Sequence, residues 1–315
     1  MHGHALLVRD RNSLDAEYEE VPMPEPGIGD VLLAVEAASF TPTELDWPST
    51  WVDRAGHDRS PVIPGHEVSG KVAALGYGTT GLAVGDAVYG VTDWYRDGAL
   101  ADYVAVEARN LAPRPASVSP ADSASLPLAG LTAWQGLFVH GNLQEDQKVV
   151  INGATGGVGS LAIQLARWAG ARVTALAHEW GRQLLGDLGA HEFVDAEAIP
   201  TGNGDADLLF DIVGGDLAHR SLAMLRPGGA VVSVVDEEPV APPAGRATFF
   251  VVEPDRDQLD KLAQLVDEGR VRPVVGGVID LAADGKGVFE AKGHGGVPGK
   301  IVVTPGHPRP PTARG

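Results

Sequence analysis

A chain of 315 residues exceeds the size at which one hydrophobic core usually stops growing, so the length predicts two domains. Its 44% hydrophobic and 21% charged residues, with no membrane-spanning apolar run and no signal-like N-terminus, indicate a soluble, cytoplasmic protein. The net charge of -18 argues against nucleic-acid and membrane partners, and the absence of cysteine excludes disulfides, thiolate zinc sites, iron–sulfur clusters and cysteine nucleophiles.

The first third of the chain has the pattern of short strands separated by turns. Strands are expected over 31–40, 68–76 and 86–91, and glycine and proline recur between them at intervals typical of all-β folds. A proline-rich segment ending at Pro120 marks the change to a different pattern. We therefore expect a β-rich first domain.

Beyond Pro120, buried-strand runs alternate with helical patterns. The strand runs lie at 149–153, 172–177, 208–214, 230–235 and 248–252, and helices are expected from the glycine-rich segment to Gly170 and over 258–269. Continuous apolar runs separated by helices indicate a parallel sheet covered on both faces. Strand-like segments at 274–281 and 299–303 then predict that the chain rejoins the first domain. The expected parts are 1–118, 119–271, a return segment 272–303 and a flexible tail 304–315.

A glycine-rich turn lies between the first strand run of the second part and the helix that follows it. Gly153 permits a sharp exit from the strand, Gly156 lets the backbone approach a pyrophosphate, and Gly159 allows tight packing of helix on sheet. The amides at the start of the helix then face the phosphates. The alternative is a purely structural turn. The expected cofactor-binding residues of this segment are Gly153, Ala154, Thr155, Gly156, Gly157, Val158 and Gly159.

The end of the strand at 172–177 bears on the choice of cofactor. NAD sites usually carry an acid there, which binds the ribose hydroxyls and repels a 2′-phosphate. Here His178 and Arg182 are spaced to reach an adenosine 2′-phosphate, which favours NADPH. Glu179 could instead serve as the ribose-binding acid, and all three residues could form an ordinary solvated helix start.

Taken together, these segments resemble the medium-chain dehydrogenase/reductase superfamily, in particular its zinc-free quinone oxidoreductase branch, the relatives of ζ-crystallin. The resemblance spans residues 5–303 and rests on PGHEVSGKVAALG, VGDAVYG, ADYVAV, LPLAGLTAWQGL, NGATGGVGSLAIQLA and GKIVV. It implies an α/β protein in which a Rossmann doubly wound parallel sheet is inserted into a GroES-like β-rich catalytic domain. It also implies homodimers formed through the Rossmann sheet.

The resemblance implies further cofactor contacts, at Thr132 and at the carboxyl ends of three strands. Each of these side chains could equally belong to the core, and the hydroxyl of Thr132 could instead cap the following helix. The expected contacts are Thr132, Val213, Gly214, Ser233, Val234, Phe250 and Val251.

Zinc-dependent members of the superfamily hold their metal with a cysteine, the histidine that matches His66, and a third ligand. By the resemblance, Thr41 and Leu128 occupy the two other ligand positions here. One imidazole does not make a zinc site, so no metal is expected. A metal-dependent enzyme stays open as an alternative because of the nearby oxygen donors Glu44, Asp46 and Glu67.

Without zinc to polarise an oxygen, the simplest hydride acceptor is a quinone or a conjugated enone, whose conjugation spreads the incoming charge. Quinone reductases often carry a tyrosine in the segment matching 39–47, but Glu44 occupies its approximate position here. The candidate catalytic residues by location are Thr43, Glu44, Trp47 and Tyr95, with Trp94 as a further pocket wall. The alternatives are a ketone or alcohol oxidoreductase on the same fold and a non-catalytic NADPH-binding protein.

Overall fold

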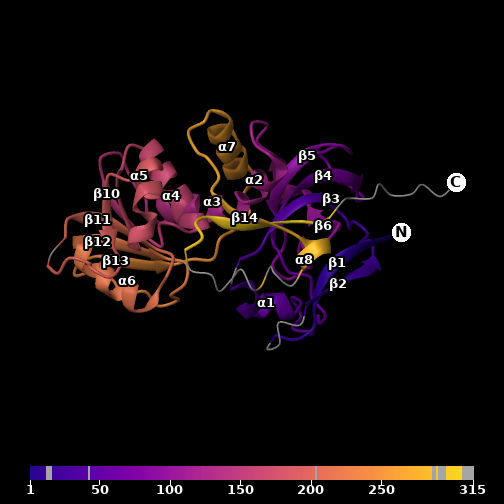
Figure 1. The fold of residues 1–315 in the computed structure, drawn as a ribbon, viewed down its shortest axis with the longest axis horizontal. Coiled ribbons are helices and arrows are strands. Elements are labelled where there is room, and N and C mark those ends of the chain that lie inside the picture. Colours follow the sequence, from indigo (N-terminus) through magenta and orange to yellow (C-terminus); the bar gives the residue numbers. More distant parts are fainter. Residues whose placement is uncertain (12–15, 42, 203, 286–288, 290–295, 307–315) are drawn as a thin grey trace. The chain divides into compact units, whose positions relative to one another are not determined.

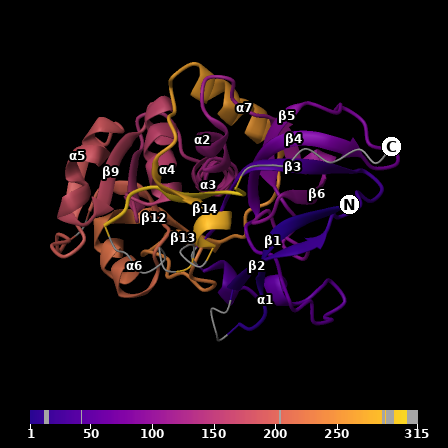
Figure 2. The ribbon, with the colours of Figure 1, turned by 45° about the vertical axis from the view of Figure 1, so that its right-hand side comes forward.

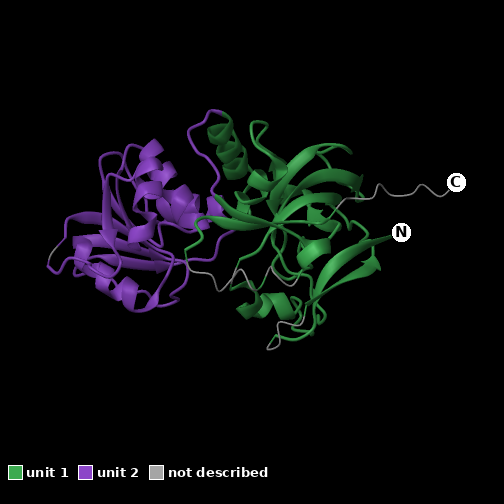
Figure 3. Cartoon of the chain, in the orientation of Figure 1, with its two compact units in different colours: residues 1–128, 254–267, 275–315 green, residues 129–253, 268–274 purple. Residues whose placement is uncertain are grey.

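A computed structural model describes the chain except residues 12–15, 42, 203, 286–288, 290–295 and 307–315. The chain forms two compact units (Figure 3). Unit 1 comprises Met1–Leu128, Pro254–Asp267 and Val275–Gly315, and unit 2 comprises Ala129–Glu253 and Glu268–Val274. Most of the tail expected at 304–315 lies outside the described residues, and Thr304 is the last residue of a strand.

Unit 1 is built on a largely antiparallel sheet, as the turn-rich pattern predicts. Within the described residues, seven strands form this sheet in the order β14-β15-β3-β4-β5-β7, and β6 also pairs with β3. Their bounds are β3 (Asp30–Ser39), β4 (Glu67–Leu75), β5 (Ala87–Val91), β6 (Tyr103–Glu107), β7 (Leu111–Pro113), β14 (Val275–Asp280) and β15 (Lys300–Thr304). β1 (His2–Val8) and β2 (Ala16–Pro22) form a separate antiparallel pair. The expected strands at 31–40, 68–76 and 86–91 are confirmed as β3, β4 and β5.

The end of the described chain rejoins this sheet, as predicted. β15 pairs antiparallel with β3, so that Val302 lies opposite Ser39 and Val303 opposite Ala38. The yellow part of the ribbon near the C-terminus, which includes β14, runs among the indigo and purple strands of unit 1 (Figures 1 and 2). Alternate side chains of β3, including Val31, Leu33 and Val35, are buried in the core of the unit. Because of this pairing, Lys300 at the start of β15 lies near the residues that directly follow β3.

Two helices within the range expected for the nucleotide-binding part, 119–271, lie in unit 1. α2 (Pro120–Ala124) begins at a capping box formed by Ser119 and Asp122 and lies against β3 and β4. α7 (Arg256–Asp267) packs on β7, and the Tyr89 hydroxyl donates to the Leu259 carbonyl at 2.7 Å. The expected boundary at 118/119 therefore differs from the observed division at Leu128.

Unit 2 is a doubly wound parallel sheet, which confirms the expected fold class. Its six described strands have the order β10-β9-β8-β11-β12-β13, and all their pairings are parallel. The strands are β8 (Lys148–Asn152), β9 (Arg172–Ala177), β10 (Glu192–Asp195), β11 (Ala206–Asp211), β12 (Leu225–Ser233) and β13 (Arg246–Phe249). The strand order reverses at β8, so β8 and β11 flank the switch point at which such sheets bind ligands.

The remaining helices that the structure describes lie between strands of the two units or follow β14. They are η1 (Glu44–Asp46), α1 (Pro48–Trp51), η2 (Ala108–Asn110), α3 (Pro127–Trp134), the π-helix η3 (Gln135–His140), α4 (Gly157–Trp168), η4 (Glu179–Gly181), α5 (Arg182–Asp187), α6 (Gly215–Ser221), η5 (Leu222–Met224) and α8 (Leu281–Asp284). None of the helices in the described part of the chain is long and apolar enough to cross a membrane.

Three strands of unit 2 end two or three residues earlier than the sequence predicts, at Asp211, Ser233 and Phe249. At two of these ends the reason is turn chemistry. The Asp211 carboxylate accepts the N–H groups of the residues at 213 and 214, and the Ser233 hydroxyl accepts those at 235 and 236. The apolar runs continue past these turns, but their last residues lie in loops.

Candidate functional site

The glycine-rich turn of unit 2 follows β8 directly, and two of its glycines are required by packing. Gly153 has φ 76°, and a Cβ there would lie 2.8 Å from Cγ2 of Val213. A Cβ on Gly159 would lie 2.3 Å from the Gly153 carbonyl oxygen and 2.6 Å from Cα of Ala154. These two positions therefore hold the turn tightly against the sheet and the first turn of α4.

Gly156 differs, because the protein itself does not require a glycine there. Its φ of -73° and ψ of 177° suit any residue, and the nearest atom to a Cβ would be the Gly153 oxygen at 3.5 Å. Among the described residues, no side-chain hydrogen bond caps the amides at the start of α4. An open approach to uncapped amides is the arrangement that binds a phosphate.

Behind this turn, a buried network joins the carboxyl ends of three neighbouring strands. The Asp211 carboxylate accepts from Asn152 Nδ2 at 2.7 Å and from the Ser233 hydroxyl at 3.1 Å. All three side chains are buried, on β8, β11 and β12. The Oδ1 atom of Asn152 is buried and has no hydrogen-bond partner among the described residues. A buried acceptor without a donor is costly, so a donor from a bound group or an ordered water fits this position.

The same edge of the sheet presents exposed apolar side chains. Val213, Val235 and Val251 each lie two residues beyond the end of β11, β12 and β13, and they are 50%, 48% and 64% exposed. Carboxyl ends of parallel strands lie at one edge, so these valines mark a common apolar surface. Val213 and Val251 are among the residues expected from the sequence, whereas Val235 is exposed in place of the expected Val234. The turn that begins at Ser233 determines which valine is exposed.

The end of β9 carries an ion pair beside the glycine turn. Arg182 Nε and Nη2 donate to the two carboxylate oxygens of Glu179 at 2.6 and 2.8 Å. The guanidinium also lies 4.1 Å from the centroid of the Phe193 ring. A Cβ on Gly181 would lie 2.3 Å from Cγ2 of Thr155, so this loop contacts the glycine turn. His178 is exposed immediately before the pair.

Of the other expected cofactor contacts, Thr132, Gly214, Ser233 and Phe250 are buried in unit 2, and Val234 is partly buried. Thr132 is buried within α3, and Phe250 is buried with its ring stacked 4.3 Å from that of His140. The Ser233 hydroxyl is engaged in the network described above.

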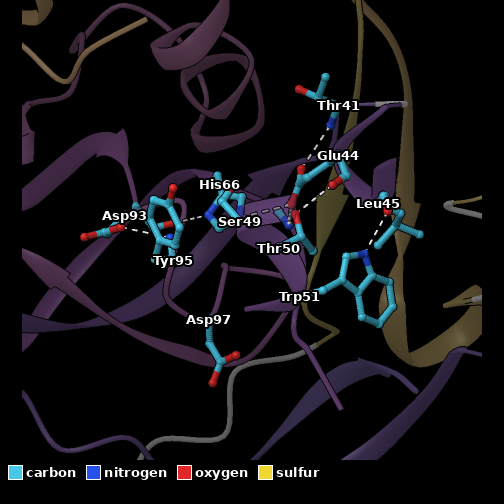
Figure 4. A network of polar contacts seen from close by, with 12 residues as sticks. Thr41, Glu44, Leu45, Ser49, Thr50, Trp51, His66, Asp93, Tyr95 and Asp97 are labelled. Atoms are coloured by element: carbon cyan, nitrogen blue, oxygen red, sulfur yellow. Dashed lines mark hydrogen bonds and ion pairs between the residues drawn. The ribbon is translucent and has the colours of Figure 1, made fainter. Parts of the chain in front are cut away.

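In unit 1, a buried carboxyl lies beside a buried imidazole (Figure 4). Glu44 and His66 are each 1% exposed, and Glu44 Oε1 lies 3.5 Å from His66 Nε2. Glu44 accepts the N–H of Gly65 at 2.5 Å and that of Thr41 at 3.4 Å. On its other side, His66 Nδ1 lies 2.5 Å from the Thr92 hydroxyl.

Burial controls the protonation of this pair. Loss of solvation raises the pKa of Glu44 from 4.5 to about 7, because it outweighs the stabilising N–H donors and the charge of Lys300. Burial, together with the charge of Arg59, lowers the pKa of His66 from 6.5 to about 3. The imidazole is therefore neutral at pH 7, while the carboxyl exchanges its proton near neutrality.

A second buried cluster, which the sequence analysis missed, adjoins the first. The Lys300 ammonium forms an ion pair with Glu67 and contacts Thr41 Oγ1 at 3.3 Å. Glu67 also accepts from the Ser39 hydroxyl at 2.7 Å and from the Leu128 N–H at 3.0 Å. The two positions matched to metal ligands, Thr41 and Leu128, are thus used in hydrogen bonds to this cluster. In the part of the chain that the structure describes, no three His, Asp or Glu side chains gather as a metal site.

One aromatic ring, that of Trp94, packs against the imidazole of His66. The Trp94 ring meets the rings of His66 and Trp47 edge-on, at 5.4 and 6.0 Å between centroids. Tyr95 lies under the Arg54 guanidinium at 4.9 Å, and Thr43 is exposed at the start of η1. Of the four candidate catalytic residues, Glu44 and Trp47 therefore gather around His66 and Trp94.

Comparisons with known proteins match both units. Residues 27–116 match the alcohol dehydrogenase GroES-like domain, which confirms the GroES-like fold, and residues 188–303 match the family described as zinc-binding dehydrogenase. The chain is 30% identical to quinone-oxidoreductase QR1 of Triphysaria versicolor over 92% of this chain and 94% of that protein. It is 33% identical to the NADPH-dependent alkenal/one oxidoreductase of Arabidopsis thaliana over 81% of this chain and 66% of that protein. The quinone oxidoreductase structure from Coxiella burnetii superposes with a TM-score of 0.84 at 27% identity, covering 96% of this chain and 99% of that one.

Proposed function

Because the chain belongs to the medium-chain dehydrogenase/reductase superfamily, in its quinone-oxidoreductase branch, we propose that it reduces a quinone or a conjugated enone with NADPH and without zinc. Membership makes it a pyridine-nucleotide-dependent oxidoreductase. The substrate class, the preference for NADPH and the zinc-free chemistry are our proposal.

The observation that carries the proposal is the open turn at Gly156, beside uncapped amides and the unpartnered Oδ1 of Asn152. The amides at the start of α4 would hold the pyrophosphate, and the exposed Val213, Val235 and Val251 would pack against the nicotinamide end. When bound, this cofactor supplies a hydride.

Reduction of a conjugated carbonyl also needs a proton, and we propose that the Glu44 carboxyl donates it. Its carboxyl, with a pKa raised to about 7, still holds a proton near neutrality. The N–H groups of Gly65 and Thr41 fix the orientation of the carboxyl, and the neutral His66 lies 3.5 Å away. We propose that Glu44 replaces the tyrosine that related quinone reductases often carry.

The test is a set of NADPH-oxidation assays against quinones and enones, with product analysis by mass spectrometry. Reduction of a quinone to the hydroquinone, or of an enone at C=C, is the expected result. Reduction at C=O would support the ketone or alcohol alternative, and tight NADPH binding without turnover would support a non-catalytic protein. Zinc found in stoichiometric amount by elemental analysis would refute the zinc-free mechanism.

The proposal includes a homodimer, which the resemblance implies for unit 2. Light scattering at micromolar concentration should give twice the chain mass of 32.8 kDa. A monomer at that concentration would refute this part. The cytoplasmic location stays a prediction, since the cited relative from Arabidopsis thaliana is described as chloroplastic.

A further inference from the structure

The amino ends of the strands in unit 2 border a cavity of about 170 Å³. The first residues of four parallel strands line it, namely Lys148, Arg172, Glu192 and Ala206. One water needs roughly 15 Å³, so the cavity has room for a small organic molecule. The glycine turn follows the carboxyl end of β8, at the opposite edge of the sheet, so this cavity is separate from the proposed cofactor site.

Three polar side chains that line the cavity lie on one face of the sheet. Thr174 follows Arg172 by two residues on β9, and β10 places Glu192 directly opposite Thr174. Residues two apart in a strand, and residues opposite each other in register, share a face. Arg172 and Glu192 are therefore diagonal neighbours, with Cα atoms roughly 8 Å apart by the rise and spacing of strands.

These three side chains are not used by the protein itself. In the described part of the chain, neither Arg172 nor Glu192 forms a hydrogen bond or ion pair through its side chain, and the Thr174 hydroxyl forms no hydrogen bond. A guanidinium, a hydroxyl and a carboxylate thus line one cavity without partners. Polar groups that converge in this way fix the orientation of a small ligand.

The other charged groups at the cavity are neutralised locally. Lys148 forms an ion pair with Asp205, and its hydrogen bond keeps the pKa of that carboxyl below the ordinary value. Burial, together with the charges of Arg167 and Arg172, lowers the pKa of His191, so this imidazole is neutral at pH 7. The charges that remain in the lining are therefore one guanidinium and one carboxylate.

Apolar side chains complete the lining. Val150 and Ala206 are buried on the strands, and the half-buried Met224 precedes β12. A ligand that matches the whole cavity therefore carries one positive group, one negative group and an apolar part.

We propose that this cavity binds a small zwitterion, namely an α-amino acid with an aliphatic side chain. Its carboxylate accepts hydrogen bonds from Arg172, and its ammonium donates to Glu192 and to the Thr174 hydroxyl. A ligand with only a negative charge is opposed by Glu192, and one with only a positive charge is opposed by Arg172. The inference does not depend on the proposed oxidoreductase reaction, because it concerns the other edge of the sheet.

The test is isothermal titration of the full chain with L-leucine and three related probes. The probes are 4-methylpentanoate, which lacks the ammonium, isoamylamine, which lacks the carboxylate, and glycine, which lacks the apolar side chain. L-leucine should bind with a dissociation constant of about 1 mM or lower, and each of the other three should bind at least about tenfold more weakly.

Three variants locate the bound L-leucine. Arg172→Gln and Glu192→Gln each remove one charge and should weaken L-leucine by about tenfold. Thr174→Ile removes the hydroxyl and fills the floor of the cavity, and it should abolish binding. The matched controls are Arg220→Gln and Glu145→Gln, which remove exposed charges outside the cavity and should leave the dissociation constant unchanged. Circular dichroism melting verifies that each variant is folded.

Absence of saturable L-leucine binding to the wild type up to about 10 mM would overturn the inference. Equal affinity for 4-methylpentanoate or isoamylamine would refute the recognition of a zwitterion. If Thr174→Ile bound L-leucine as tightly as the wild type, the ligand would lie elsewhere and this cavity would not be its site.

Discussion

Substitution of Gly156 or Gly159 by alanine should have opposite effects: Gly159→Ala should lower the free energy of unfolding, and Gly156→Ala should weaken NADPH binding. In Gly159→Ala, the new Cβ would lie 2.3 Å from the Gly153 carbonyl oxygen and 2.6 Å from Ala154 Cα. Backbone atoms cannot rotate away, so overpacking should cost about 2–3 kcal/mol. Alanine in place of glycine within a helix returns about 1 kcal/mol, which leaves a net loss of about 1–2 kcal/mol.

Gly156→Ala should behave in the opposite way. Its Cβ would meet no atom closer than 3.5 Å, so its free energy of unfolding should lie within about 0.5 kcal/mol of the wild type. The methyl group would nevertheless occupy the space above the uncapped amides and weaken NADPH binding by about tenfold or more.

Urea unfolding followed by circular dichroism measures the first effect, and NADPH fluorescence titration measures the second. Wild-type stability of Gly159→Ala would refute the packing argument. Wild-type NADPH affinity of Gly156→Ala would show that the backbone at this turn does not approach the pyrophosphate.

The remaining predictions concern three buried positions, Glu44, Lys300 and Ser233. Because its pKa is raised to about 7, Glu44 keeps its proton below about pH 7, and kcat/KM for quinone reduction should therefore fall as pH rises through 7. Glu44→Gln should lower kcat/KM by about 100-fold and abolish this fall in the pH profile. The raised pKa of Glu44 also adds to the free energy of unfolding below pH 4.5, and this contribution is lost as pH rises to about 7. In urea titrations, the free energy of unfolding of the wild type relative to Glu44→Gln should therefore decline between pH 4.5 and about 7. A difference that stays constant over this interval would contradict the raised pKa. Lys300→Met leaves Glu67 buried without its cation and should cost about 3–5 kcal/mol of unfolding free energy, most of which Glu67→Gln should restore in the double variant. Ser233→Ala removes one donor to Asp211 and should cost about 1–2 kcal/mol while also weakening NADPH binding, and a loss of stability alone would separate the network from the cofactor site.

Local patterns in the sequence were sufficient for most of the fold. Continuous apolar runs identified the parallel strands, and the strand, glycine and helix order located the turn at Gly153–Gly159, because these signals depend on residues that are neighbours in the chain. The ends of β11 and β12 were misplaced because side-chain turns at Asp211 and Ser233 stop strands whose apolar runs continue.

The roles of side chains whose partners lie far away in the sequence were harder to predict. Lys300 reaches Glu67 and Thr41 only because β15 pairs with β3, and no local pattern records that pairing. The GHE motif pointed to His66, but the sequence could not show how completely Glu44 is buried, and that burial sets its pKa. Similarly, the spacing of Glu179 and Arg182 allowed either cofactor, whereas the structure shows the two side chains bound to each other.

The shared carboxylate of Asp211 has a consequence for redesign of this protein. The Asp211 carboxylate forms hydrogen bonds with residues at the start of the loops that follow β8, β11 and β12. A substitution at Asn152, Asp211 or Ser233 would therefore disturb the positions of all three loops. The exposed side chains of Val213, Val235 and Val251, in the loops after β11, β12 and β13, take no part in this polar network. Directed evolution toward another ligand should therefore accumulate changes at Val213, Val235 and Val251 and leave the three polar anchors untouched.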